Sequence, residues 1–93
     1  MFFLVKVQVK PSTLKQFAQA LQNGELDNTR VRGDTWCLKD EPAVGYSVWE
    51  TADRKDFDKR FNPWRAYYEQ VDIQEVFTPK EAMMALFGQL QTK

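Results

Sequence analysis

Five side chains with chemically useful groups fall where they could surround one pocket. They are a lone cysteine, an acidic residue that interrupts an apolar row, and three aromatic residues: Cys37, Glu75, Tyr46, Trp64 and Tyr68. Between a sheet and its covering helices, these groups would form a mostly apolar pocket with a few polar atoms, which suits an aromatic small molecule. The alternative is that the aromatic rings only fill the core, because a short chain needs bulky residues to bury enough apolar surface.

Glu75 and Cys37 each allow a catalytic and a structural interpretation. A partly buried Glu75 could act as a general acid or base, whereas a position near a strand end would let its carboxylate reach water. Cys37 could be a nucleophile, but nothing nearby in the sequence predicts an activating base, and a buried structural thiol is the alternative. We therefore treat both as pocket candidates and assign no catalytic residue.

The composition excludes several kinds of site. The chain has no histidine, which removes the commonest metal ligand, the usual general base near neutral pH and a histidine-ligated haem. Because Cys37 is the single cysteine, zinc would have only carboxylates and one thiolate, and no internal disulfide can form. We therefore expect no metal, no cofactor, and a reducing, cytoplasmic compartment.

Nucleic acids and membranes are not expected as partners either. The 13 basic residues balance 13 acidic ones, so no net charge attracts a polyanion. The stretch Gly45–Trp49 is similar to the aromatic third strand of RNA-recognition modules, but Val48 stands where the second exposed aromatic residue belongs. The apolar run Met1–Val9 is too short to span a membrane, Lys6 interrupts it, and no signal-peptide pattern follows.

The element that organises the chain is its first predicted strand, Met1–Val9. One face is apolar throughout, at Phe3, Val5, Val7 and Val9, and the other face is apolar at first and polar later. A strand with this pattern belongs in the middle of a sheet that is covered on both sides. A helix is expected next, from a cap at Ser12 or Thr13 to Gly24.

The pair Thr29–Lys39 and Ala43–Glu50 then predicts a hairpin, with a bulge or turn at Gly33. A turn centred on Glu41–Pro42 would place Cys37 opposite Tyr46 and Trp36 opposite Ser47. In that register one face of the hairpin carries Thr35, Cys37, Val44, Tyr46 and Val48, and the other carries Trp36, Leu38 and Trp49.

The second half of the chain contains a helix, a strand and a second helix. Thr51 can cap the first helix, which should break near Phe61 because Pro63 removes a backbone hydrogen bond. The next strand is expected over Val71–Phe77, and Thr78–Glu81 contains a capping box. The last helix then presents an apolar stripe at Met83, Leu86, Phe87 and Leu90.

This order predicts one ferredoxin-like βαββαβ domain over residues 1–93, with strand order four-one-three-two and an extra C-terminal helix. Both main helices would cover one face. The opposite face would expose more apolar surface than a monomer usually shows, so we expect two copies to pack as a dimeric α+β barrel. The terminal helix could cross this face or dock on the partner. Candidates for the barrel interior or a wet dimer face are Phe2, Leu4, Lys6, Trp36, Ser47, Trp49 and Gln74.

The stretches CLKDEPAVGYSVWE and RFNPWRAYYEQVDIQEVFTPKEA, together with this topology, resemble a bacterial subgroup of the dimeric α+β barrel superfamily. That superfamily includes muconolactone isomerases and antibiotic-biosynthesis and quinol monooxygenases. The resemblance implies a homodimer that binds a small aromatic or lipophilic molecule, with cofactor-independent isomerase or monooxygenase-type chemistry. No catalytic motif is matched residue by residue, so no site residue is carried over. The alternative is a non-catalytic regulatory or protein-interaction module whose dimerisation is its function.

Overall fold

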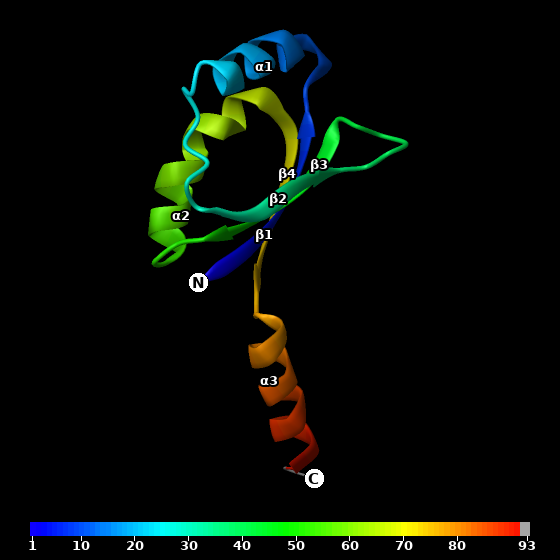
Figure 1. Cartoon of the computed structure of the whole chain (residues 1–93), viewed down its shortest axis with the longest axis vertical. Coiled ribbons are helices and arrows are strands. Elements are labelled where there is room, and N and C mark those ends of the chain that lie inside the picture. The colour runs from blue at the N-terminus through cyan, green and yellow to red at the C-terminus, as the bar shows by residue number, and fades with distance from the viewer. Residues whose placement is uncertain (92–93) are drawn as a thin grey trace.

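A four-stranded antiparallel sheet lies at the centre of the computed structural model, which describes residues 1–91 and the side chains of residues 1–88 (Figure 1). The strands are β1 (Phe2–Val9), β2 (Val31–Cys37), β3 (Val44–Glu50) and β4 (Tyr68–Val76). Their order across the sheet is β2-β3-β1-β4. The predicted ferredoxin-like order is therefore confirmed, with β1 between two neighbours as its apolar pattern requires.

The main helices lie on one side of this sheet (Figure 1). They are α1 (Leu14–Gln22), preceded by a short 3-10 turn η1 (Pro11–Thr13), and α2 (Arg54–Phe61), followed by the 3-10 segment η2 (Asn62–Tyr67). The predicted break near Phe61 is confirmed, because the chain tightens into η2 where Pro63 cannot continue α-helical hydrogen bonding. The last helix, α3, spans Pro79–Gln91.

The helix ends follow from local side chains. The Thr78 Oγ1 hydroxyl donates to Glu81 Oε1 at 2.9 Å and accepts from the Glu81 backbone N–H at 3.2 Å, which confirms the predicted capping box. At α2 the cap is Asp53 and not Thr51 as predicted, because Asp53 Oδ1 accepts from the Asp56 N–H at 2.8 Å. Thr51 is buried, and its hydroxyl donates instead to the Asp53 carbonyl at 2.8 Å.

The core lies between β1, β3 and the α2–η2 segment. Phe3 and Val5 of β1 are almost fully buried. Trp49 of β3 meets the rings of Phe57 and Phe61 edge to face, with centroids 5.6 and 5.5 Å apart. This aromatic cluster holds α2 against the sheet.

The register of the hairpin corrects one sequence prediction. Trp36 pairs with Tyr46 and Cys37 pairs with Gly45, because the connecting turn is centred near Glu41 and not between Glu41 and Pro42. Since side chains alternate along a strand, this one-residue difference reverses the face of β3.

The reversal moves several predicted residues. Gly45, Ser47 and Trp49 face the helices, and Tyr46 lies on the outer face. The prediction that Trp49 and Ser47 line a dimer face was wrong, as was the prediction that Tyr46 faces the helices. Trp49 is only 2% exposed beneath its own chain's helices.

The outer face of the sheet keeps the other predicted residues. The pairing places Leu4 between Val48 and Gln74, and Lys6 between Tyr46 and Asp72. The Lys6 ammonium lies 5.9 Å from the centre of the Tyr46 ring. Phe2 and Trp36 share this face, and Trp36 is 69% exposed. Whether these side chains contact a second copy stays a prediction.

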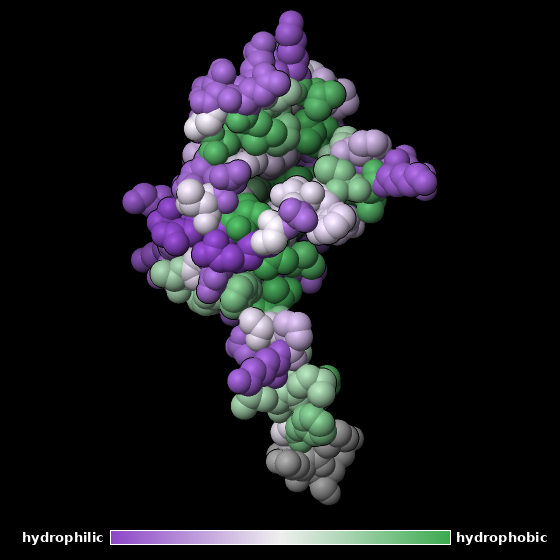
Figure 2. Space-filling model, in the orientation of Figure 1, coloured by the Kyte–Doolittle hydropathy of each residue, from purple (hydrophilic) through white to green (hydrophobic). Residues whose placement is uncertain are grey.

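Helix α3 extends away from the sheet and the other helices (Figure 1). The molecule measures 53 × 31 × 20 Å, and its radius of gyration of 15.7 Å exceeds the roughly 12 Å expected for a compact chain of this length. In Figure 2, polar residues lie at the start of α3 and hydrophobic ones farther along it. The large hydrophobic side chains exposed on α3 and just before it are Phe77, Met83, Met84, Leu86 and Phe87. The Leu90 side chain lies outside those described. Among the described residues, no helix has the length and apolar character to cross a bilayer.

Candidate functional site

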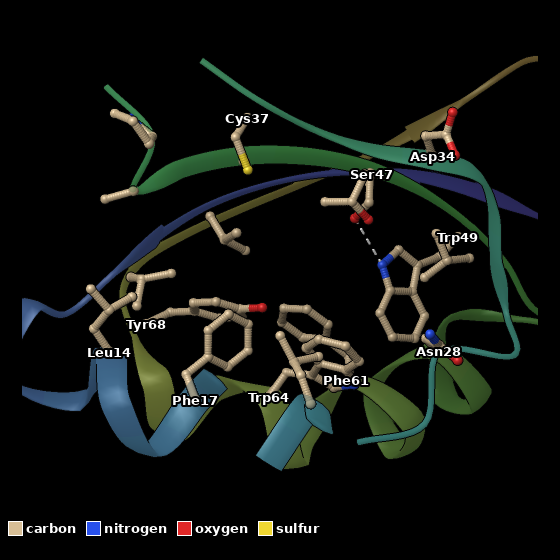
Figure 3. Close-up of a pocket in the computed structure, with 18 of the residues that line it drawn as sticks. Leu14, Phe17, Asn28, Asp34, Cys37, Ser47, Trp49, Phe61, Trp64 and Tyr68 are labelled. Atoms are coloured by element: carbon tan, nitrogen blue, oxygen red, sulfur yellow. Dashed lines mark hydrogen bonds between the residues drawn. The ribbon is translucent and has the colours of Figure 1, made fainter. Parts of the chain in front are cut away.

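A cavity of about 760 Å³ lies between the helix-facing side of β2 and β3 and the layer formed by α1 and η2 (Figure 3). Aliphatic side chains from β1 and α1 contribute to its walls, among them Val7, Val9, Leu14 and Leu21. It opens to solvent along β2, where Asp34 and Thr35 are exposed. The cavity therefore reaches from the surface to the aromatic core.

The cavity exists because one wall is built from small residues. The lining positions of β2 and β3 include Gly33, Thr35, Cys37, Gly45 and Ser47, which leave unfilled the space that larger side chains would occupy. A Cβ built on Gly45 would lie 3.7 Å from Cys37 Sγ and 3.8 Å from Val7 Cγ2, which are ordinary contacts. An alanine methyl group would therefore fit at position 45 without a steric clash.

The bulge predicted at Gly33 is confirmed, and it shapes the mouth of the cavity. Pairing between β2 and β3 shifts between Arg32 and Trp36, and Gly33 has φ +74°. That left-handed conformation favours glycine, since a Cβ would be strained there. The bulge bends the edge strand away from regular pairing with β3.

The opposite wall is aromatic and held in place by its own contacts. Phe17 of α1 meets the Trp64 ring edge to face with centroids 6.1 Å apart, and Phe61 stacks on Tyr68 at 6.0 Å. The Trp64 indole N–H donates to the Asp27 carbonyl at 3.2 Å. These contacts fix the rings, so the wall is a preformed aromatic surface.

Tyr68 supplies the most deeply placed polar group. Its side chain is 8% exposed, and its hydroxyl points into the cavity (Figure 3). The hydroxyl makes no hydrogen bond with any described residue. Burial raises the pKa of the Tyr68 phenol, and the nearby Cys37 thiol adds to this effect, so the phenol is protonated at neutral pH.

The small-residue wall adds further polar groups, Ser47 and Cys37 among them, and Thr35 and Asp34 near the mouth. The Ser47 hydroxyl accepts from the Trp49 indole N–H at 3.1 Å, and the Cys37 Sγ points into the cavity (Figure 3). Among the described residues that line the cavity, Asp34 is the one charged side chain, and none is a lysine or an arginine. Within the described part of the chain, no three Cys, Asp or Glu residues lie close enough to hold a metal ion.

The structure brings together only some of the predicted pocket residues. Cys37, Trp64 and Tyr68 line one cavity, whereas Tyr46 lies on the other side of the sheet. Glu75 is exposed near the end of β4, opposite Phe3, and does not line the cavity. Whether the three lining residues contact a ligand stays a prediction.

Other lining residues could not be recognised from the sequence. Ser47 and Trp49 were assigned to the wrong face of the sheet. Phe17 and Leu14 stood out only as part of an apolar stripe of α1, because helical spacing shows that such residues are turned inward but not that they border empty space.

Comparison with known proteins identifies the fold. No protein-family model and no curated protein sequence matches the chain. Among solved structures, the chain is similar to 5-chloro-2-hydroxyhydroquinone dehydrochlorinase from Burkholderia phenoliruptrix, in complex with 2,5-dihydroxybenzoquinone. That likeness has 11% identity and a TM-score of 0.50, and covers 87% of this chain and 98% of the other.

Two further solved structures have lower TM-scores. An Agrobacterium tumefaciens protein has 13% identity and a TM-score of 0.49 over 85% of this chain and 98% of its own. An antibiotic biosynthesis monooxygenase has 16% identity and a TM-score of 0.44 over 84% of this chain and 100% of its own. The chain thus has the ferredoxin-like α+β fold of this group of proteins, as its resemblance implied. The low identities establish no more than the fold.

Proposed function

We propose that the chain binds a small aromatic or lipophilic molecule in the cavity between α1, η2 and the small-residue wall of β2 and β3. The observation that carries this proposal is that Phe17, Phe61 and Trp64 form a wall of a cavity that they do not fill. Its volume of about 760 Å³ falls within the range of roughly 300–1,000 Å³ common for ligand sites. A mostly apolar lining with a few polar atoms suits a ring-shaped ligand.

A reaction in this cavity would have to use the polar groups that face it. Of the pocket candidates with polar atoms, Cys37 and Tyr68 face the cavity, whereas Glu75 and Tyr46 do not. Cofactor-independent isomerase or monooxygenase-type chemistry is therefore the enzymatic form of this proposal. The dehydrochlorinase of similar fold is complexed with a quinone, which makes small cyclic compounds the first class to test. We place the protein in the cytoplasm, where Cys37 would remain a free thiol.

Binding can be tested with indane, a bicyclic aromatic hydrocarbon, by titration followed through the fluorescence of the tryptophans. Trp49 and Trp64 line the cavity, so occupancy should change their emission. Thr35→Phe places a ring in the cavity mouth and should weaken binding at least tenfold. Gln70→Phe adds the same ring at an exposed position of β4, outside the cavity lining, and should leave binding unchanged. Equal affinities for the two variants would contradict the proposed site.

We also propose that two copies associate through the outer faces of their sheets. The support is the apolar outer face of the sheet, where Phe2, Leu4 and Val48 are half-buried and Trp36 is exposed, together with the exposed Leu86 and Phe87 of α3. Apolar patches on monomers rarely exceed a few hundred Å². Burial of each large apolar side chain contributes about 1.5–3 kcal/mol, so several from each copy offset the roughly 4–15 kcal/mol cost of association. Lys6 and Gln74 would then lie at or near the interface.

The same surface supports the alternative function, a non-catalytic module that acts through its contacts with another copy or another protein. The exposed stripe of α3 is the observation in its favour. Native mass spectrometry of the purified protein separates the two functions, since it reports subunit number and bound small molecules together. A dimer with a bound ligand supports the binding function, a dimer that takes up no aromatic probe supports the interaction module, and a strict monomer contradicts association.

A further inference from the structure

The lining residues that the structure describes offer hydrogen-bond donors and include no lysine or arginine. We infer that its ligand is an uncharged aromatic compound with a carbonyl or similar acceptor oxygen, which the Tyr68 hydroxyl binds. This inference rests on the proposed binding function and adds the chemical class of the ligand to it. Tyr68 is then the residue that selects and orients the ligand. The aromatic wall contacts any flat ring, whatever its substituents.

The position of the Tyr68 hydroxyl favours a hydrogen bond with a ligand. The side chain is more than nine-tenths buried, and its hydroxyl points into the cavity (Figure 3). No described residue accepts or donates a hydrogen bond to it. Among the described residues, the hydroxyl oxygen is not one of the fully buried polar atoms that lack a partner, so it is reachable from the open cavity. A ligand oxygen in the space in front of the hydroxyl can therefore accept its hydrogen bond.

In this hydrogen bond the protein is the donor and the ligand is the acceptor. Burial raises the pKa of the Tyr68 phenol, so the group carries its proton and can donate it into a hydrogen bond. On the facing wall, the Ser47 oxygen already accepts from the Trp49 indole N–H at 3.1 Å, which leaves the hydroxyl proton of Ser47 available to donate. The Tyr68 and Ser47 hydroxyls can therefore both donate to a ligand, and a ligand with acceptor oxygens complements them.

The charge of the lining residues favours an uncharged ligand. Among the lining residues, no lysine or arginine is present, and Asp34 is negative. A carboxylate or phosphate would lose its hydration without gaining a cation in return, which is strongly unfavourable in an apolar cavity. An ammonium group could be attracted by Asp34, but that residue lies on the exposed part of β2, away from the buried Tyr68. The deep end of the cavity thus favours a neutral acceptor.

The inference is tested with four compounds that share one bicyclic ring: indanone, indane, indane carboxylate and aminoindane. Titration by nuclear magnetic resonance gives the affinity of each. Indanone should bind about 2- to 12-fold more tightly than indane, the range for one net hydrogen bond. Tyr68→Phe should remove that advantage, so that indanone and indane bind the variant with equal affinity. Tyr67→Phe removes the same hydroxyl from the adjacent residue, which does not line the cavity, and should retain the advantage.

A second measurement does not depend on a folded variant. The carbonyl stretching band of indanone should move to lower frequency on binding to the natural protein, because a hydrogen bond weakens the C=O bond. An unshifted band, or equal binding of indanone and indane, overturns the inference while the proposed function stands. Tighter binding of the carboxylate or of aminoindane overturns it as well. If no compound binds, the proposed function and the inference both fail.

Discussion

The indole of Trp49 meets the indole of Trp64 edge to face, with ring centroids 5.7 Å apart and planes at 86°. Trp49 belongs to β3 and Trp64 to η2, so this contact joins the sheet to the segment that forms the aromatic wall of the cavity. Both rings are buried. The contact therefore serves the core and the candidate site at once, and it exists only because the register turns Trp49 toward the helices.

The two strand tryptophans should differ sharply in their effect on stability. Trp49→Ala removes a fully buried ring and should lower the free energy of unfolding by about 3–5 kcal/mol. Trp36→Ala removes a ring that is 69% exposed and should change it by less than about 0.5 kcal/mol at low protein concentration. Urea denaturation of both variants measures the difference. Similar losses for the two would contradict the register described above.

Gly33 should tolerate substitution poorly although it has room for a side chain. No atom lies within 4 Å of a Cβ built at this position, but its φ is +74°. Gly33→Val should therefore destabilise the protein by about 1–2 kcal/mol through backbone strain. Gly88→Ala is the control, since it also has open space around it but lies in a helix, where alanine is favoured. Thermal unfolding should show a lower midpoint for Gly33→Val only.

Acid should destabilise the fold through two aspartates near Arg60. The pKa of Asp27 is lowered mainly by the hydrogen bond from the Thr29 hydroxyl at 2.6 Å, and that of Asp56 mainly by the Ala52 backbone N–H at 3.1 Å and by Arg60. Because these carboxyl groups titrate lower in the folded chain than the ordinary value of 3.8, their stabilisation is present above about pH 4. It is lost as the pH falls through their lower folded values.

Melting curves between pH 7 and pH 2 measure this effect. Asp56→Asn should lower the midpoint at pH 7 and flatten its fall below about pH 4. Asp40→Asn, in the exposed hairpin turn, should leave the shape of the profile unchanged. A profile for Asp56→Asn that runs parallel to that of the natural protein at all pH values would show that the Asp56 carboxylate does not stabilise the fold.

The apolar outer surface should control association without affecting folding. Trp36→Lys and Leu86→Lys place charges on the outer sheet face and on α3, where both native side chains are exposed. Each should shift the protein from dimer to monomer in sedimentation experiments while the unfolding midpoint of the monomer stays the same. Arg65→Glu, at an exposed position of η2, is the control. A dimer that is unaffected by both lysine variants would contradict association through this surface.

Much of the fold could be predicted from the sequence because its signals are local. The two-faced pattern of β1, the capping box of Thr78 and Glu81, the break before Pro63 and the bulge at Gly33 all depend on neighbouring residues alone. The face of β3 could not be predicted in the same way. The sequence around Glu41 and Pro42 fits turns that differ by one residue, and only packing of Trp49 against Phe57 and Phe61 selects between them.

The candidate site depended on that choice of register. Cys37, Trp64 and Tyr68 could be named as inward-facing residues, but the small-residue wall appears only when Gly45 and Ser47 face the helices. A cavity is the absence of atoms between several elements, and no local pattern encodes it. The same limit applies to α3, whose apolar stripe was predictable but whose projection from the sheet was not.

Intermolecular nuclear Overhauser effects between indane and the protein show whether an aromatic ring occupies the cavity. We expect contacts from indane to the methyl groups of Val7 and Leu14, which line the cavity. We expect none to Met84, which is exposed on α3, the helix that extends away from the sheet and the other helices (Figure 1). Contacts confined to α3 or to the outer face of the sheet, or no contacts at saturating indane, would contradict binding in the cavity.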